Sequence, residues 1–104
     1  MNSTRREVPE VRFLTSGEVT DTDRNEAERA VRAALSDIPG DIDTVQVTLT
    51  LLADPSLPRP ALAQALVAVD GHRLRAQAAA PALPEAIDLL RNRLSLRVSY
   101  LRAS

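Results

Sequence analysis

Arginine is the residue type in this chain that is best suited to binding a charged partner. All thirteen basic residues are arginine, and a guanidinium group binds phosphate or carboxylate through two parallel hydrogen bonds. Residues 1–70 hold seven arginines against twelve acidic residues, a net charge of −5, whereas residues 71–104 hold six against two, a net charge of +4. The last third of the chain could therefore form an anion-binding surface. A high-GC coding bias combined with intramolecular ion pairs is the alternative explanation of this composition.

Residue types that support catalysis or metal binding are scarce. The chain has no cysteine and a single histidine, His72, which excludes thiol catalysis, disulfides and multi-histidine metal sites. Asp21, Asp23, Asp41 and Asp43 form carboxylate pairs, but they lie at a helix entry and in a loop, where aspartate is favoured for caps and turns. No glycine-rich phosphate loop or metal-ligand spacing accompanies them. We therefore expect no enzyme, catalytic residue, metal, cofactor or small-molecule substrate.

Length and composition predict one small domain with an aliphatic core. The chain has 104 residues, 44% of them apolar and 26% charged, as in an ordinary globular domain. Phe13 and Tyr100 are the only aromatic residues, which argues against RNA recognition by base stacking. The polar start and the lack of a run of ~18 apolar residues predict a cytoplasmic protein with no membrane contact. We expect a flexible arm over residues 1–9 and a single domain over residues 10–104.

The first half of the domain predicts a strand, a helix and a second strand. Residues 10–15 alternate as in a short strand, and a helix follows, capped by Thr20 or Asp23 and stopped by Pro39-Gly40. A capping box from Asp23 to Glu26 fits this start. The helix has one apolar stripe, formed by Ala27, Val31, Ala34, Leu35 and Ile38. Residues 44–52 then alternate strictly, as in a strand with one buried face.

The arginines of this first helix lie off its apolar stripe. Arg24, Arg29 and Arg32 alternate with Glu26 and Glu28. On this pattern alone, a solvated face with ion pairs along the helix is favoured over an anion site.

The second half predicts a hairpin followed by a long helix. The strand-like runs 61–69 and 73–79 flank Asp70-Gly71, the sequence of a type I′ turn, with His72 as an exposed turn residue. Arg73, Arg75 and Gln77 would share one face of the last strand. In the helix over residues 83–101, Pro84 and Glu85 suit the first turn, and one stripe is formed by Ile87, Leu90, Leu94, Val98 and Leu101. Arginines also follow one another along this helix, at positions 91, 93, 97 and 102.

These elements predict an α+β, two-layer sandwich in the order β-α-β-β-β-α. Each helix has one dominant apolar stripe, so both would lie side by side on the same face of a four-stranded sheet. Leu89, Leu96 and Tyr100, with Arg93 between them, fall on the side of the last helix away from its stripe. A homodimer formed through this helix, or a partner protein, would cover these residues. Scattered exposed side chains are the alternative.

Several short motifs, in this order, resemble the N-terminal domain of ribosome hibernation promoting factors. The family is also called protein Y, ribosome-associated inhibitor, or sigma-54 modulation protein. The motifs are the helix entry 18–21 (EVTD), the turn 69–71 (VDG) followed by Leu74 and Ala76, and the segment 86–90 (AIDLL) with Leu94. The resemblance spans about residues 10 to 102.

This resemblance implies a fold like that of double-stranded-RNA-binding domains and a role in ribosome hibernation. The family domain binds the small ribosomal subunit in the channel for messenger and transfer RNA, and so regulates translation under starvation or dormancy stress. Phosphate contact requires surface charge at the correct spacing but no aromatic ring. The positions implied to contact rRNA are Arg24, Arg29 and Arg32 on the first helix, Arg73 and Arg75 on the fourth strand, and Arg91, Arg93 and Arg97 on the second helix.

A divergent protein-binding or dimerisation module of the same fold, which has lost RNA binding, is the alternative function. The acidic first two-thirds of the chain and the Leu89, Leu96 and Tyr100 stripe favour it.

Overall fold

A computed structural model of the chain describes residues 9–38 and 40–103, so the arm expected over residues 1–9 lies almost entirely outside the described residues. The elements are β1 (Val11–Ser16), α1 (Asp21–Leu35), β2 (Ile42–Leu51), β3 (Ala61–Val69), β4 (His72–Ala80) and α2 (Leu83–Ala103). None of the described helices combines the length and the apolar character that a bilayer crossing requires.

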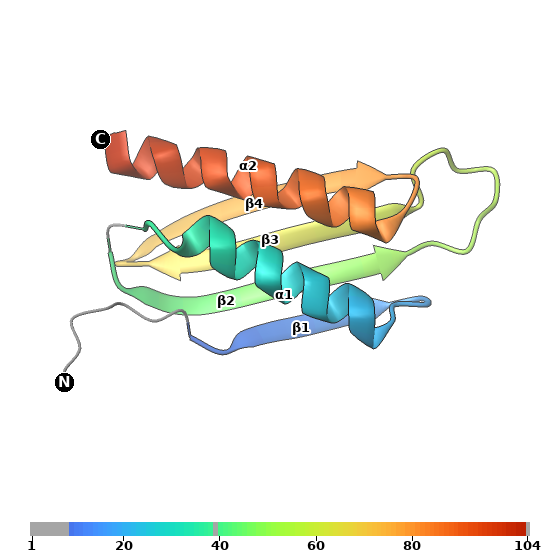
Figure 1. Cartoon of the computed structure of the whole chain (residues 1–104), viewed down its shortest axis with the longest axis horizontal. Helices are drawn as coiled ribbons and strands as arrows, with labels where there is room; N and C mark the ends of the chain where they lie inside the picture. The colour runs from blue at the N-terminus through green and yellow to red at the C-terminus, as the bar shows by residue number, and fades with distance from the viewer. Residues whose placement is uncertain (1–8, 39, 104) are drawn as a thin grey trace.

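The four strands form one sheet in the order β1-β2-β3-β4, and both helices lie on one face of it (Figure 1). β2, β3 and β4 pair antiparallel, whereas β1 pairs parallel with β2 because α1 returns the chain across the sheet before β2 begins. The predicted two-layer α+β sandwich with the order β-α-β-β-β-α is confirmed. β1 and β4 are the two edges of the sheet.

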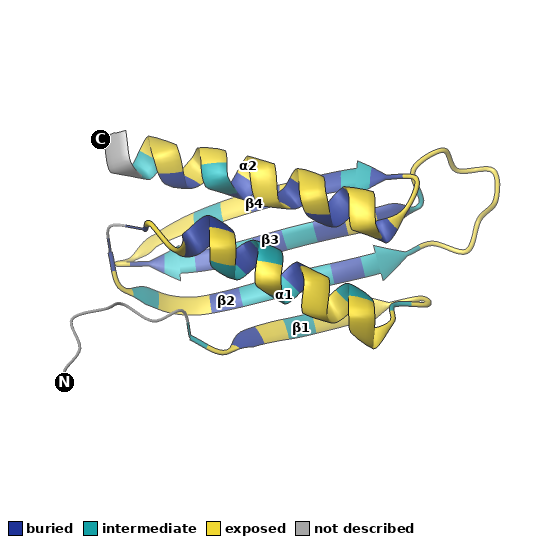
Figure 2. Ribbon diagram, in the orientation of Figure 1, coloured by how far each residue is buried: buried dark blue, intermediate teal, exposed yellow. Residues whose placement is uncertain are grey.

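The core lies between the sheet and the helices, as the burial pattern shows (Figure 2). Val45, Val47 and Leu49 of β2 are 0% exposed, so the predicted alternation of this strand is confirmed. The predicted stripe of α1 is buried throughout, and in α2 only Leu101 of the predicted stripe remains partly exposed. α2 packs over β3 and β4, where the buried side chains include Ala61, Ala63, Ala65, Ala76, Ala78 and Ala80.

α1 begins with a capping box at Thr20. The Thr20 Oγ1 accepts from the Asp23 amide at 3.1 Å, and the Asp23 carboxylate accepts from the Thr20 amide at 3.1 Å. Of the two predicted caps, Thr20 is therefore the residue used, and the predicted box from Asp23 to Glu26 is wrong. Each side chain satisfies one amide that the first helical turn leaves without a partner.

α1 ends earlier than Pro39-Gly40, where the sequence pattern placed its end. Leu35 is its last residue and Ser36 is the C-cap, whose amide and hydroxyl both donate to the Ala33 carbonyl. The apolar pattern continues to Ile38 because Ile38 is still buried in the core, although its amide now donates to Leu35 in a tighter turn. The stripe thus describes burial correctly but overestimates the length of the helix.

The turn between β3 and β4 has the predicted type I′ backbone. Asp70 and Gly71 have φ of 49° and 80°, and positive φ at both central residues defines this turn. The turn sets the register in which Val69 is opposite His72. As predicted, His72 is exposed, and Arg73, Arg75 and Gln77 are exposed on one face of β4.

Gly17 stands where β1 leaves the sheet, and its backbone admits no side chain. Its φ is 85°, and a Cβ built there would lie 2.0 Å from the Leu51 carbonyl oxygen. Gly71 also has a positive φ, of 80°, but a Cβ there would meet nothing within 4 Å. A side chain at residue 71 would therefore cause backbone strain alone, whereas a side chain at residue 17 would cause both backbone strain and steric overlap.

We predict that Gly17→Ala destabilises the protein more than Gly71→Ala. The positive φ alone costs an alanine about 1–2 kcal/mol at each site, and only at residue 17 must the end of β2 also move. Urea unfolding of the two variants measures this difference. Equal losses of unfolding free energy would show that the contact between Gly17 and Leu51 relaxes without cost.

Candidate anion-binding site

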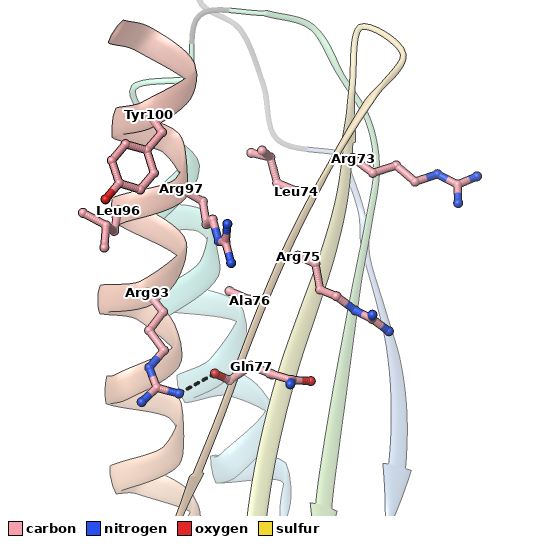
Figure 3. Close-up of a pocket in the computed structure, with 9 residues that line it drawn as sticks. All are labelled: Arg73, Leu74, Arg75, Ala76, Gln77, Arg93, Leu96, Arg97 and Tyr100. Atoms are coloured by element: carbon pink, nitrogen blue, oxygen red, sulfur yellow. Dashed lines mark hydrogen bonds between the residues drawn. The ribbon is translucent and has the colours of Figure 1, made fainter. Parts of the chain in front are cut away.

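A groove of about 590 Å³ runs between the exposed edge of β4 and the flank of α2. Figure 3 shows its lining, which comes from these two elements alone. The lining residues are Arg73, Leu74, Arg75, Ala76, Gln77, Arg93, Leu96, Arg97 and Tyr100. Four of the eight arginines predicted to contact rRNA therefore belong to the lining of one groove. We call this site the β4–α2 groove.

Strand and helix periodicity place the four arginines around the groove. Arg73 and Arg75 are two residues apart on β4, so both side chains project from the face of the sheet opposite the helices. Arg93 and Arg97 are one turn apart on α2 and point toward β4 (Figure 3). The edge of β4 thus has two arginines on each side.

One hydrogen bond joins the two walls of the groove. The Arg93 guanidinium donates to the backbone carbonyl oxygen of Gln77 at 2.7 Å. This bond holds the Arg93 side chain against the strand edge without neutralising its charge, because the acceptor is a neutral carbonyl.

The charged side chains that line the groove are all arginines. Within residues 9–38 and 40–101, no acidic residue lines the groove and none of its four arginines forms an ion pair. Glu85 and Asp88 lie nearer the start of α2, in a neighbouring hollow that also includes Arg59 and Arg93. Four like charges around one open groove produce a positive potential that attracts anions.

The three arginines predicted on α1 lie in a different electrostatic setting. Arg24 pairs with Asp21, Arg29 with Glu26 at 3.5 Å, and Arg32 with Glu28 at 2.9 Å. All three pairs lie along the helix at spacings of three or four residues. The predicted ion pairing of this face is confirmed. The paired acids neutralise the positive charge that an anion-binding site on α1 would need.

Arg91, the remaining predicted rRNA contact, is exposed but does not line the groove. It precedes Arg93 by two residues, which on an α-helix corresponds to a rotation of about 200° around the axis. Arg91 therefore belongs to another flank of α2. The structure separates it from the Arg93 and Arg97 pair with which the sequence grouped it.

Leu89, Leu96 and Tyr100 are exposed by 38%, 54% and 63%, as the sequence pattern predicted. Leu96 and Tyr100 line the β4–α2 groove, whereas Leu89 lines the neighbouring hollow beside Arg59. Sequence reasoning did not foresee that two of these apolar residues share a groove with the arginines. The helical spacing of Arg93, Leu96, Arg97 and Tyr100 was the available signal.

Comparisons with known proteins identify the same fold in two solved structures. A ribosomal subunit interface protein from Coxiella burnetii matches with a TM-score of 0.71 and 17% identity, over 90% of this chain and 98% of that one. The N-terminal domain of Protein Y from Thermus thermophilus matches with a TM-score of 0.69 and 24% identity, over the same shares. At these identities the likeness is one of fold. The sequence matches no protein-family model, and no curated protein is significantly similar to it.

Titratable groups outside the groove do not form a second site. Across the described residues, no three histidine or acidic side chains gather where they could hold a metal ion. Asp54, in the loop after β2, accepts from the Ser56 amide at 3.0 Å and from its hydroxyl at 2.8 Å, and these bonds lower the pKa of the Asp54 carboxyl group. This arrangement stabilises a turn in the loop.

We predict that charge reversal separates the arginines of α1 from those of the groove. Arg32→Glu removes the pair with Glu28 and places two acids one turn apart, which should reduce the unfolding free energy by about 0.5–1 kcal/mol. Arg97→Glu breaks no ion pair among the described residues and should change the unfolding free energy by less than about 0.5 kcal/mol. Urea unfolding at low ionic strength measures both values. A larger loss for Arg97→Glu would mean that the groove arginines serve the fold.

Proposed function

We propose that this protein is a non-enzymatic, ribosome-associated translation inhibitor of the cytoplasm. In this proposal it binds rRNA of the small ribosomal subunit in the channel for messenger and transfer RNA, and acts as a hibernation factor in starved or dormant cells. The observation that carries the proposal is the β4–α2 groove, where four arginines and, within the described residues, no acidic side chain line one open site.

The spacing of the groove arginines suits a polyanion. Arg73 and Arg75 are separated by about 7 Å along the strand, and Arg93 and Arg97 by about 6 Å along the helix axis. Two short rows of guanidinium groups, on either side of one strand edge, can follow a backbone that carries a charge on every unit. Each contact releases a counterion from the nucleic acid, and this release supplies binding energy without reading the sequence.

The groove composition favours contact with the phosphate backbone over contact with bases. Tyr100 is its only aromatic residue, so a row of stacked bases has no platform. Phosphate and sugar contacts position a protein on a folded RNA through shape and charge. This is the mode expected of a protein that recognises a ribosomal channel.

The fold similarity supports the same proposal. One solved structure of this fold is named a ribosomal subunit interface protein, and the other is a domain of Protein Y. Among the residues named from the sequence, we assign the main rRNA contacts to Arg73, Arg75, Arg93 and Arg97. Arg24, Arg29 and Arg32 contribute less, because their charges are matched by acids on α1.

We predict that replacing Arg73, Arg75 and Arg97 together with glutamine weakens binding to small ribosomal subunits. The slope of log affinity against log salt should fall by between about 2 and 3, because each lost phosphate contact removes about 0.7–0.9 from it. Arg93 is left in place so that its bond to Gln77 is preserved. Sedimentation with purified subunits over a salt series measures the slope.

The matched control is the triple replacement of Arg24, Arg29 and Arg32 with glutamine on α1. It removes the same formal charge, but from residues that already have acidic partners. We expect its salt slope to change by less than about 1. Equal slopes for the two triple variants would remove the β4–α2 groove from the proposal.

A further inference from the structure

β4 is an edge strand whose outer backbone groups face the β4–α2 groove. Among the described residues it pairs only with β3, and the Gln77 carbonyl oxygen points outward, since it accepts from Arg93 of α2. In an antiparallel strand the amide and carbonyl of one residue point to the same side, and the side alternates along the strand. The backbone groups of residues 73, 75, 77 and 79 therefore face away from β3.

Both sides of this edge have two arginines, but the helix side of the groove adds two exposed apolar residues. There, Leu96 and Tyr100 are exposed by 54% and 63% and line the groove together with Arg93 and Arg97. On the open face of the sheet, the side chains of Arg73, Arg75 and Gln77 follow one another along β4 (Figure 3). Phosphate binding uses the arginines but explains neither the apolar pair nor the free strand edge.

We propose that the β4–α2 groove also binds an extended acidic segment of another protein, which adds to the sheet as a fifth strand along β4. Such a segment hydrogen-bonds to the outer backbone groups of β4, a recognised mode of peptide binding. Its side chains alternate between the two sides of the sheet. One set contacts Leu96 and Tyr100, and the other faces Arg73 and Arg75. The fitting sequence therefore alternates apolar and acidic residues.

Charge selects an acidic partner over a second copy of this chain. Symmetric pairing of two β4 edges would bring Arg73 and Arg75 of both copies together on one face of the joined sheet. Like charges placed opposite each other disfavour such pairing, and charged side chains are a common protection of sheet edges. The other edge strand, β1, has Arg12 on its exposed face. Pairing of β4 with β1 of a second copy would therefore not place acidic side chains opposite Arg73 and Arg75. Acidic side chains of an added segment are instead attracted to Arg73 and Arg75.

In the free protein, Arg93 occupies one of the outward backbone groups of β4. Its bond to the Gln77 carbonyl occupies the middle of the strand edge, which an incoming strand would take with its own amide. The displaced guanidinium would then lie next to the acidic segment. The edge is thereby protected in the free protein and still available to a partner.

The proposal is tested with a ten-residue peptide of alternating glutamate and valine, acetylated and amidated at its ends. The control peptide has the same composition, with five glutamates followed by five valines. Amide hydrogen exchange of the full chain, followed by NMR, reports on β4 residue by residue. We expect the alternating peptide to slow exchange at residues 73, 75, 77 and 79, whose amides point outward.

Two pairs of variants locate the binding. Gln77→Pro removes one outward amide without breaking the ladder to β3 and should weaken peptide binding roughly tenfold, whereas Gln77→Ala should change it less than about twofold. Leu96→Asp should also weaken binding roughly tenfold, whereas Leu62→Asp, at an exposed leucine on the open face of β3, should have little effect. If Gln77→Pro does not fold, the Leu96→Asp result decides.

Several outcomes would overturn the proposal. These are equal binding of the block peptide, no binding, binding of an RNA oligonucleotide only, or protection of the outward amides by self-association without peptide. The proposal stands apart from the ribosomal function, because the peptide experiment contains no ribosomes. A failure of wild-type ribosome binding would leave the peptide result intact.

Discussion

The close approach of α2 to the edge of the sheet depends on small side chains beneath it. Most of the core positions of β3 and β4 are alanine, and Ala63, Ala65, Ala76 and Ala78 are buried. This floor leaves room for Leu90 and Leu94, both 0% exposed. Because the helix lies close, Arg93 reaches the Gln77 carbonyl and Arg97 points over the strand edge. Larger residues in the floor would lift α2 and widen the groove, since packed interiors accept little added volume.

Net charge is a poor guide to the surface of this protein. The chain carries −1 overall, yet Asp21, Glu26 and Glu28 on α1 are paired with arginines of the same helix. The groove between β4 and α2 is lined by four arginines and, within the described residues, by no acidic side chain. Ion pairs along α1 hold opposite charges together, so they contribute little field at a distance. Four of the arginines that form no ion pair within the described residues therefore line one open site, which also holds two exposed apolar residues and the outer edge of β4. The same site thus offers separate features to an RNA backbone and to an acidic strand.

Periodicity predicted which residues are buried, and much of the fold followed from it. The stripes of both helices, the alternation of β2 and the Asp70-Gly71 turn are local patterns, and each is confirmed. The start and end of α1 were predicted less well, because Thr20 and Asp23 both fit capping rules and Ile38 keeps the helical pattern beyond Leu35. The groove required more than local pattern: the register of β4, the phase of α2 and the choice of acidic partner for each arginine. For Arg91 and Arg93, helical periodicity in the sequence would have been enough to place the two residues on different sides of α2.

The central claim is that the β4–α2 groove binds the small ribosomal subunit where messenger RNA passes. Its most direct test is sedimentation of the purified chain with small subunits at physiological salt, with and without bound messenger RNA. We predict that the protein sediments with empty subunits and is displaced when messenger RNA is bound, because the protein and messenger RNA would occupy the same channel. Equal sedimentation with empty and occupied subunits would place the protein elsewhere on the ribosome, and no sedimentation with either would contradict ribosome binding itself.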